Sequence, residues 1–571
     1  MGIKHFFGWL RNNFDKDLKY LQSYETVPDR HGIIIDELLI DMNGLFHTAA
    51  QKVYRYGNHK PPKRLLPLNR PGLSQEEKNA RVKAREEQMY HEICSNIELL
   101  INKVRPTYRI VLCTDGPAPM SKQNQQRQRR FRNSSESSDK DIFDSNCLTP
   151  GTEIMDRLSK YIESYILSQI SQNPFWRKLE IIFSNEKVPG EGEHKCIQYL
   201  RRYCYSSITY CIVGNDADLL MLSLGTHLPN FYILREDSFY THGNNFFLID
   251  VGSIYISLGK RLNWSQEKFN LRNGIIDFIF LCFMTGNDFL PHIPSVEIIE
   301  DGIEIILSIY QDVCSEFDIH LVQEYSNNGI VFNKKVLKQI LTEIGNLEKD
   351  CFESKLNKKE CYFPDPLLNK SSIQLADGKI SVDITEYNSK YISKTFGKNQ
   401  RNIKNGCHRY LEGLRWVINY YLKGVPDWKW LYPYHYAPPA SLLVEYIQNY
   451  QDINYEKLEF NCPLLPFQQL LSVLPPQSAH LLPHPLSELL KDKSSSLAQY
   501  CPDEVKIDLA GKKQEWEAVV LVPVIDYKVV LEEYNKNINK VPRKYSSRNY
   551  FGNTYLYKSV SDKPKSEIFF L

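Results

Sequence analysis

Short, almost wholly apolar runs recur along the N-terminal part of the chain. They occupy residues 33–40, 109–114, 179–183 and 208–213. Runs without polar alternation are typical of strands buried on both faces of a parallel sheet. Between and after them come stretches with helical spacing of apolar residues, among them 193–203 and 274–284. The pattern predicts an α/β fold, with a mostly parallel central sheet flanked by helices.

Other segments interrupt this pattern and suggest how the chain is divided. Residues 57–87, rich in Lys, Arg and Pro, predict an exposed excursion before a helix from about Met89 to Val104. The Ser-rich residues 133–140 predict a loop. Patterning weakens after about residue 300. We therefore expect an N-terminal domain over 1–300, a variable connecting region over 301–383, and a second, α-rich lobe over 384–571.

Composition narrows the class of protein. A chain of 571 residues is too long for one compact core, which agrees with two lobes. The net charge of +2 is too small to attract nucleic acid to the whole molecule. Binding of nucleic acid would therefore need local basic patches. The 13 cysteines include no C-x-x-C pair, which favours reduced thiols over disulfides or zinc. Without a signal-peptide pattern or an apolar stretch of spanning length, we expect a soluble intracellular protein with no membrane partner.

Acidic residues gather at the ends of the expected strands and in glycine-containing turns. Because ligands bind outside the carboxyl ends of parallel strands, these carboxylates could converge on one site. Crowded carboxylates stay ionised only when cations neutralise them, and oxygen ligands suit Mg²⁺ or Mn²⁺. Two such ions can hydrolyse a phosphodiester. The alternative is a set of surface acids and helix caps. The candidates are Asp41, Asp115, Glu191, Glu193, Asp216, Asp218 and Asp288.

A basic segment follows the second of these acids. Residues 121–132 read SKQNQQRQRRFR, and helical spacing places Lys122, Gln126, Arg129 and Arg130 on one face. Arginines on such a face can grip a terminal phosphate through paired hydrogen bonds. The alternative is a solvated charged helix face.

Aromatic residues supply candidates for contacts with bases. His47 follows Asp41 by six positions and could stack on a base, although an isolated histidine is more often structural. The segment 428–436 is unusually aromatic and includes Trp428 and Trp430. Aromatic faces stack on unpaired bases without requiring a sequence. A buried aromatic core joining the lobes is an equally good interpretation.

Taken together, these motifs resemble the XRN-type 5′→3′ exoribonucleases, a family with a cytoplasmic and a nuclear branch. Nearly the whole chain takes part in the resemblance. It ends at Leu571 without the long C-terminal extension of the cytoplasmic branch, like a minimal catalytic core. The segments that carry the resemblance are 40–43, 115–119, 124–127, 143–147, 188–195, 216–219, 286–292, 412–416, 432–438 and 511–518.

The resemblance implies a function for each group of residues. The seven acids would bind catalytic Mg²⁺ (or Mn²⁺), with two ions. Lys122, Gln126, Arg129 and Arg130 would form a 5′-phosphate pocket, and His47 would stack on the first bases opposite Trp428 or Trp430. The fold would be a PIN or flap-nuclease-like lobe joined to the second lobe. The expected activity is processive hydrolysis of single-stranded RNA with a 5′-monophosphate to mononucleotides, in RNA decay or processing.

Two other functions remain open from the sequence. A flap-type structure-specific endonuclease would share the acidic α/β site but would need an element that holds a duplex. A catalytically inactive RNA-binding scaffold would retain the fold without needing the seven acids. Neither the RNA targets nor the protein partners can be identified from the residues.

Overall fold

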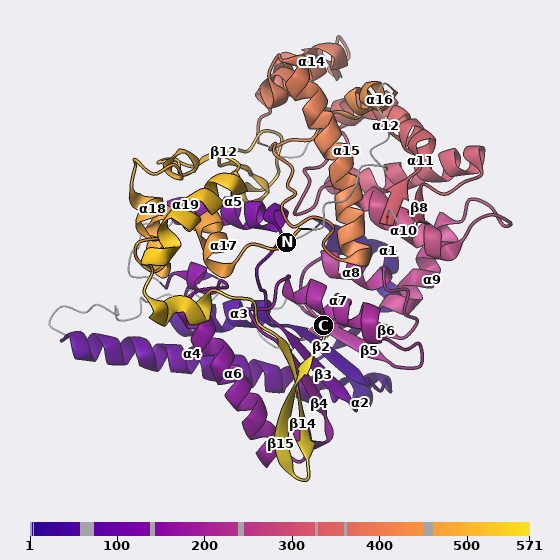
Figure 1. The fold of residues 1–571 in the computed structure, drawn as a ribbon. Coiled ribbons are helices and arrows are strands. Elements are labelled where there is room, and N and C mark those ends of the chain that lie inside the picture. Colours follow the sequence, from indigo (N-terminus) through magenta and orange to yellow (C-terminus); the bar gives the residue numbers. More distant parts are fainter. Residues whose placement is uncertain are drawn as a thin grey trace.

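A nine-stranded sheet organises the computed structural model, which describes Ile3 and residues 5–57, 74–136, 143–237, 245–325, 329–358, 363–448 and 461–571. The strand order is β1-β7-β6-β5-β2-β3-β4-β14-β15 (Figure 1). The strands are β1 (Leu18–Leu21), β2 (Glu37–Asp41), β3 (Arg109–Cys113), β4 (Glu180–Ser184), β5 (Tyr210–Val213), β6 (Phe231–Glu236), β7 (Phe246–Asp250), β14 (Thr554–Val560) and β15 (Lys563–Phe569).

The central strands are parallel, as the apolar runs predict. Strands β6, β5, β2, β3 and β4 pair in parallel, while β7 and β14 flank them antiparallel. Side chains of β2 alternate between two cores: Leu39 packs on one face, and Leu38 and Ile40 on the other. Both faces are therefore buried, which explains why the strand is apolar throughout. The predicted α/β fold class is confirmed.

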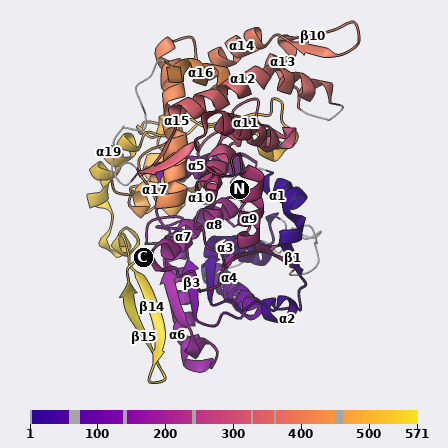
Figure 2. The same ribbon diagram turned by 90° about the vertical axis from the view of Figure 1, so that its right-hand side faces the viewer.

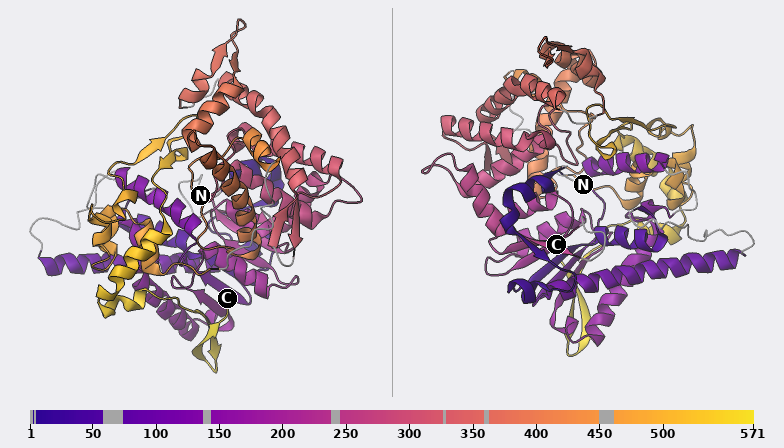
Figure 3. Two further views of the ribbon diagram at one scale, coloured as in Figure 1. Left: turned by 45° about the horizontal axis from the view of Figure 1, so that its top comes forward. Right: turned by 180° about the vertical axis from the view of Figure 1, so that it is seen from behind.

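Helices cover the two faces of the sheet. One core contains side chains of α3, α4 and α6, and the other contains side chains of α1, α7, α8 and α9. The long helix α4 projects from the body of the molecule (Figure 3). The bounds are α1 (Phe6–Phe14), α2 (Val27–His31), α3 (Met42–Tyr54), α4 (Gln75–Val104), α6 (Glu153–Gln172), α7 (Gly192–Tyr203), α8 (Asp218–Leu224) and α9 (Val251–Leu262).

The second core continues without a break into a helical region, at the end of the molecule away from the β14–β15 hairpin (Figure 2). Two small hairpins, β8–β9 and β10–β11, belong to this region. Its elements are α10 (Leu271–Cys282), α11 (Gly302–Phe317), β8 (Val322–Tyr325), β9 (Gly329–Phe332), α12 (Lys334–Asn357), α13 (Pro366–Lys370), β10 (Ser372–Gln374), β11 (Ile380–Val382), α14 (Ile384–Phe396), α15 (Gln400–Lys423) and α16 (Ala440–Gln448).

A further core forms around α5 (Met120–Glu136), the helix that carries the basic segment. Met120 packs against apolar residues of α17 and α19, and Phe131 packs against β13. Residues distant in sequence therefore hold α5 in place on both sides. The C-terminal elements are α17 (Pro466–Val473), α18 (Glu488–Lys491), β12 (Lys506–Asp508), β13 (Val519–Leu521) and α19 (Tyr527–Asn537).

Two local predictions need correction. The helix expected from about Met89 begins at Gln75, so the second part of the predicted excursion is helical. A capping box joins Ser74 to Glu77, and that S-x-x-E spacing was the available signal. The loop expected from Asn133 is also wrong at its start, because α5 continues to Glu136. Residues 137–142 and 58–73 lie outside the described part of the chain.

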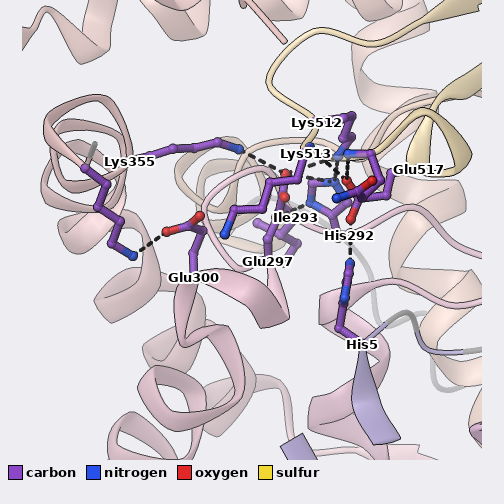
Figure 4. Close-up of polar contacts among 11 residues, drawn as sticks. His5, His292, Ile293, Glu297, Glu300, Lys355, Lys512, Lys513 and Glu517 are labelled. Atoms are coloured by element: carbon purple, nitrogen blue, oxygen red, sulfur yellow. Dashed lines mark hydrogen bonds and ion pairs between the residues drawn. The ribbon is translucent and has the colours of Figure 1, made fainter. Parts of the chain in front are cut away.

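A polar network ties four distant segments together (Figure 4). Glu297 Oε1 lies 3.1 Å from Lys512 Nζ and 3.5 Å from Lys355 Nζ. Lys512 also contacts His292 Nε2 at 2.9 Å. Five residues further on, Glu517 accepts a 2.5 Å hydrogen bond from His5. The C-terminal segment thereby contacts the N-terminus and the turn that follows Asp288, and α12 joins the network through Glu297.

Within the described ranges, no helix combines the length and the apolar character that crossing a membrane requires. The cysteines of the described residues carry free thiols.

Candidate active site

Six of the seven predicted acids lie at the carboxyl ends of parallel strands or in the connections that follow them, and the seventh comes from a turn after α10. Asp41 ends β2, Asp115 follows β3, and Asp216 follows β5. Glu191 is the N-cap residue of α7, with Glu193 in its first turn, and Asp218 begins α8. The N-termini of α3, α7 and α8 favour negative charge at this position.

Short backbone contacts hold the first two acids together. Asn43 donates its N–H to Asp41 Oδ1 (3.2 Å), and its side-chain oxygen accepts from Asp115 N (3.1 Å). Gly192 N donates to Asp115 Oδ1 at 2.7 Å. A Cβ on Gly192 would lie 2.3 Å from Asp41 Oδ1, so only glycine permits this approach. Asp41 is the N-cap residue of α3, and it also lies close enough to Asp115 for the two charges to interact.

The carboxylates also perturb one another electrostatically. Burial and then the charge of Asp115 raise the pKa of Asp41 well above its ordinary value. Burial and then the charge of Asp288 raise the pKa of Asp218 to about 7. Burial, followed by Asp218 and Asp216, likewise raises the pKa of Glu193. Because the charge of each acid affects the pKa of its neighbours, the acids lie close together. A cation bound among them would reduce their mutual repulsion.

Lys122 supplies a cation inside this neighbourhood. Its Nζ lies 2.6 Å from Glu191 Oε2 and 2.7 Å from Asp288 Oδ2. Although burial alone would lower it, these two carboxylates raise the pKa of Lys122 well above its ordinary value. The ammonium group neutralises part of the cluster, and it links the basic helix α5 to the acids.

A metal ion needs several donor side chains arranged around one point. Across the described ranges, no group of three or more His, Cys, Asp or Glu side chains is arranged so that it could hold a metal ion. The donor chemistry nevertheless fits a hard divalent cation, because buried carboxylate oxygens predominate. The contacts of Lys122 with Glu191 and Asp288 occupy oxygens that such a cation would use.

The basic helix presents two neighbouring guanidinium groups toward the acids. Burial lowers the pKa of Arg129, while Asp288, Asp216 and Asp115 oppose that effect. Burial and then the charge of Arg129 lower the pKa of Arg130 to about 9. Arg130 Nη1 and Gln126 Oε1 are buried without a hydrogen-bond partner among the described residues. An unpaired buried guanidinium N–H calls for an acceptor, and a phosphate oxygen would provide one.

The candidate stacking residues differ in their surroundings. Burial and then the charges of Arg129 and Arg130 lower the pKa of His47 to about 4, which places His47 beside the arginines. Trp428 is half-buried, and its carbonyl accepts from Met120 N at the start of α5. Trp430 is 3% exposed and stacks on Trp416 at 5.0 Å. Trp428 lies beside α5, whereas Trp430 belongs to the core.

Two residues of α15 touch the acids but were not singled out from the sequence. Tyr420 OH donates to Glu191 Oε1 at 2.6 Å, and Tyr421 OH donates to Asp218 Oδ2 at 2.9 Å. The backbone N–H of Ile3 donates to Asp218 Oδ1 at 3.2 Å. Buried tyrosines on the packed face of an amphipathic helix carry no sequence signal that separates these contacts from ordinary packing.

Acids at the carboxyl ends of parallel strands, three of them buried and all bordered by arginines, are the arrangement expected of an enzyme that acts on phosphate esters. Comparison with known families agrees. The model described as the XRN 5′-3′ exonuclease N-terminus matches residues 1–237, and that of the Xrn1 helical domain matches residues 268–380 and 378–570. The chain belongs to the XRN 5′-3′ exonuclease family, as the sequence resemblance predicted.

Individual relatives extend over nearly all of the chain. A Drosophila melanogaster 5′-3′ exoribonuclease 2 homolog is 27% identical over 98% of this chain and 73% of its own length. Human 5′-3′ exoribonuclease 1 is 27% identical over 95% of this chain. The Saccharomyces cerevisiae 5′-3′ exoribonuclease 1 is 27% identical over 98% of it. The chain spans 35% and 44% of the length of these last two relatives.

Among solved structures, the catalytic core of Rad2 in complex with a DNA substrate is distantly similar to this chain. It shares 16% identity, covers 68% of this chain and 86% of its own, and has a TM-score of 0.31. A similarity this distant carries no argument about function.

Proposed function

We propose that this chain is a divalent-metal-dependent 5′→3′ exoribonuclease that removes mononucleotides from single-stranded RNA bearing a 5′-monophosphate. The observation that carries the proposal is the direct contact between a buried acidic cluster and the basic helix α5. Lys122 touches two of the acids, and Arg130 has an unpaired N–H close by. The names of the relatives, all 5′-3′ exoribonucleases, support the direction and the substrate class.

In this proposal each part of the site has a separate task. Arg129, Arg130 and Gln126 bind the terminal phosphate, and Lys122 bridges it to the acids. His47 and Trp428 stack on the first bases without selecting a sequence. Asp41, Asp115, Glu191, Glu193, Asp216, Asp218 and Asp288 would hold Mg²⁺ or Mn²⁺.

The chemistry follows from this arrangement. Two bound divalent ions would supply an activated water and stabilise the leaving oxygen of the phosphodiester. The buried carboxylates keep the site negative enough to hold them, and the arginines fix the first phosphate so that the next bond reaches the acids. The proposal includes a closed pocket, in which the side chains of α5 admit a terminal monophosphate and exclude a phosphate that carries further groups. Selection for a monophosphate follows from that restriction.

The test compares RNA with a 5′-monophosphate and the same RNA with a 5′-triphosphate, each incubated with the protein and Mg²⁺. We expect progressive loss of the monophosphate RNA alone, with mononucleotide products. Asp216→Ala should be inactive, and EDTA should stop the reaction. Arg130→Gln should reduce kcat/KM on the monophosphate RNA by about 10-fold or more, because a charge-assisted hydrogen bond is lost.

Other outcomes would contradict parts of the proposal. Cleavage of both RNAs at equal rates would contradict the assignment of a phosphate pocket. Internal cuts would favour a flap-type endonuclease. Stable RNA binding without cleavage, unchanged by Asp216→Ala, would favour a scaffold.

A further inference from the structure

Two consecutive tyrosines of α15 reach separate carboxylates of the acidic cluster. Tyr420 donates to Glu191, the residue before α7, and Tyr421 donates to Asp218 at the start of α8. Each tyrosine is only 1% exposed. The hydrogen bonds join α15, in the second half of the chain, to acids that follow β4 and β5. The separations in sequence are 229 and 203 positions.

The packing around these rings fixes their directions. His194 of α7 stacks on Tyr420 with ring centres 3.8 Å apart and planes 6° apart. The same histidine meets Tyr421 edge-on, at 5.5 Å and 83°. Phe289, next to Asp288, contacts both tyrosines edge-on, at 5.6 and 6.4 Å. With both rings held on several sides, each hydroxyl can donate only toward its own carboxylate.

The chemistry of the donors suits a carboxylate that must also bind a cation. Each ionised carboxylate has about four lone-pair sites, so a hydroxyl that uses one leaves others available. A phenol donor is neutral and does not compete with a cation by charge, whereas Lys122 does. Burial raises the pKa of both tyrosines well above its ordinary value, so they remain protonated donors.

Asp218 is held from two sides. Its Oδ2 accepts from Tyr421 and its Oδ1 from the backbone N–H of Ile3, which is 1% exposed. Glu191 likewise uses Oε1 for Tyr420 and Oε2 for Lys122. A carboxylate restrained at both oxygens keeps one orientation, which is the condition for repeated binding of an ion in a fixed geometry.

We propose that Tyr420 and Tyr421 are positioning residues that orient Glu191 and Asp218 for a divalent cation. The second half of the chain would then complete the metal site itself, beyond enclosing the substrate. This inference rests on the proposed metal-dependent function. It assigns to α15 a direct effect on metal affinity.

The test measures Mn²⁺ binding by isothermal titration calorimetry, with no RNA present. Tyr420→Phe and Tyr421→Phe remove one hydroxyl each and keep the packed rings. We expect each to weaken Mn²⁺ binding by about 10-fold or more, the usual effect of losing a group that orients a metal ligand. Because the two variants probe different carboxylates, each tests the inference separately.

A matched control comes from another buried tyrosine–carboxylate pair. Tyr310 OH donates to Asp277 Oδ2 at 2.8 Å, away from the acidic cluster, and both residues are buried. Tyr310→Phe should leave Mn²⁺ affinity unchanged. In RNA cleavage assays, excess Mn²⁺ should restore kcat of the Tyr420 and Tyr421 variants but not of Asp216→Ala.

Two results separate this inference from the proposed function. If the wild type binds Mn²⁺ in a manner that Asp216→Ala abolishes, yet both tyrosine variants bind it equally well, the positioning role is wrong. If Asp216→Ala leaves the wild-type isotherm unchanged, the acids do not hold the ion, and the metal-dependent function fails with the inference.

Discussion

In this site, the same acidic side chains are held close together by hydrogen bonds and repel one another by charge. The acids lie close to one another, and that closeness costs stability when no cation neutralises them. Asp218 shows the conflict directly, since burial and the charges of Asp288 and Asp216 raise its pKa to about 7. Tyr421 and Ile3 hold it in place despite this repulsion.

Asp218→Asn should therefore stabilise the metal-free protein. The folded pKa of about 7 lies above the ordinary value of 3.8, so the folded state binds more protons between these pH values. Stability from this group falls as pH rises through that window and is lowest above pH 7. At pH 8, without divalent ions, we expect the variant to gain about 1–3 kcal/mol in unfolding free energy.

Thermal melting from pH 4 to pH 8 would check this prediction. The gain should shrink toward pH 4, and Mg²⁺ should stabilise the wild type more than the variant. Asp377→Asn, at an exposed turn, serves as the control and should change nothing. A variant less stable than the wild type at pH 8 would show that hydrogen bonding by Asp218 outweighs its repulsion.

At the scale of elements, the junctions between strands and helices bring the acids together. Gly192 at the start of α7 lets the helix approach Asp41 and donate to Asp115. The N-terminus of α7 therefore meets the ends of β2 and β3 at Gly192. A small shift of α7 would move several carboxylates at once.

Gly192→Ala tests that junction. The added Cβ would meet Asp41 Oδ1 at 2.3 Å and the carbonyl of Cys113 at 3.1 Å, so α7 must move. We expect RNA cleavage to fall by about 10- to 100-fold, the effect of displacing reacting groups by a fraction of an ångström to one ångström. Gly44→Ala on α3, where nothing lies within 4 Å of the new Cβ, should retain activity. Equal rates for both variants would contradict the close-approach argument.

The same scale shows what sequence could and could not predict. The strands β2 and β5 and the acids beside them follow from local pattern, because a buried strand and its terminal carboxylate are neighbours in sequence. Helix α5 followed from the spacing of its basic residues. Tyr420 and Tyr421 could not be predicted, since their partners lie more than 200 positions away and only the fold brings them together. Trp428 and Trp430 could be distinguished only by burial.

At the scale of the whole molecule, the polar network around Glu297 joins segments that are not part of the nine-stranded sheet (Figure 4). Burial and the charge of Lys512 lower the pKa of His292 to about 4, so this histidine is uncharged at neutral pH. In the acid range where Glu297 titrates, His292 is charged, and His292, Lys512 and Lys355 together hold the pKa of Glu297 well below its ordinary value, although burial alone would raise it. One carboxylate compensates two largely buried ammonium groups.

Glu297→Gln should destabilise the protein by about 3 kcal/mol, because it removes the carboxylate that both largely buried lysines contact. The midpoint of urea unfolding at pH 7 would measure this. Glu386→Gln breaks the more exposed ion pair with Lys390 and should cost less than about 1 kcal/mol. Similar midpoints for the two variants would show that the network is solvated like a surface pair.

The β14–β15 hairpin has a consequence for how the polypeptide reaches its native state. Strand β14 pairs with β4, and the side chains of Thr554 and Ser184 that meet there are 370 positions apart. During synthesis, β4 must wait roughly 20–70 s, at the usual elongation rate, before its partner leaves the ribosome. Throughout that interval its backbone N–H and C=O groups remain an open template for strands of other chains. The nascent protein is therefore most exposed to misassembly late in translation, when most of its other elements have already been made.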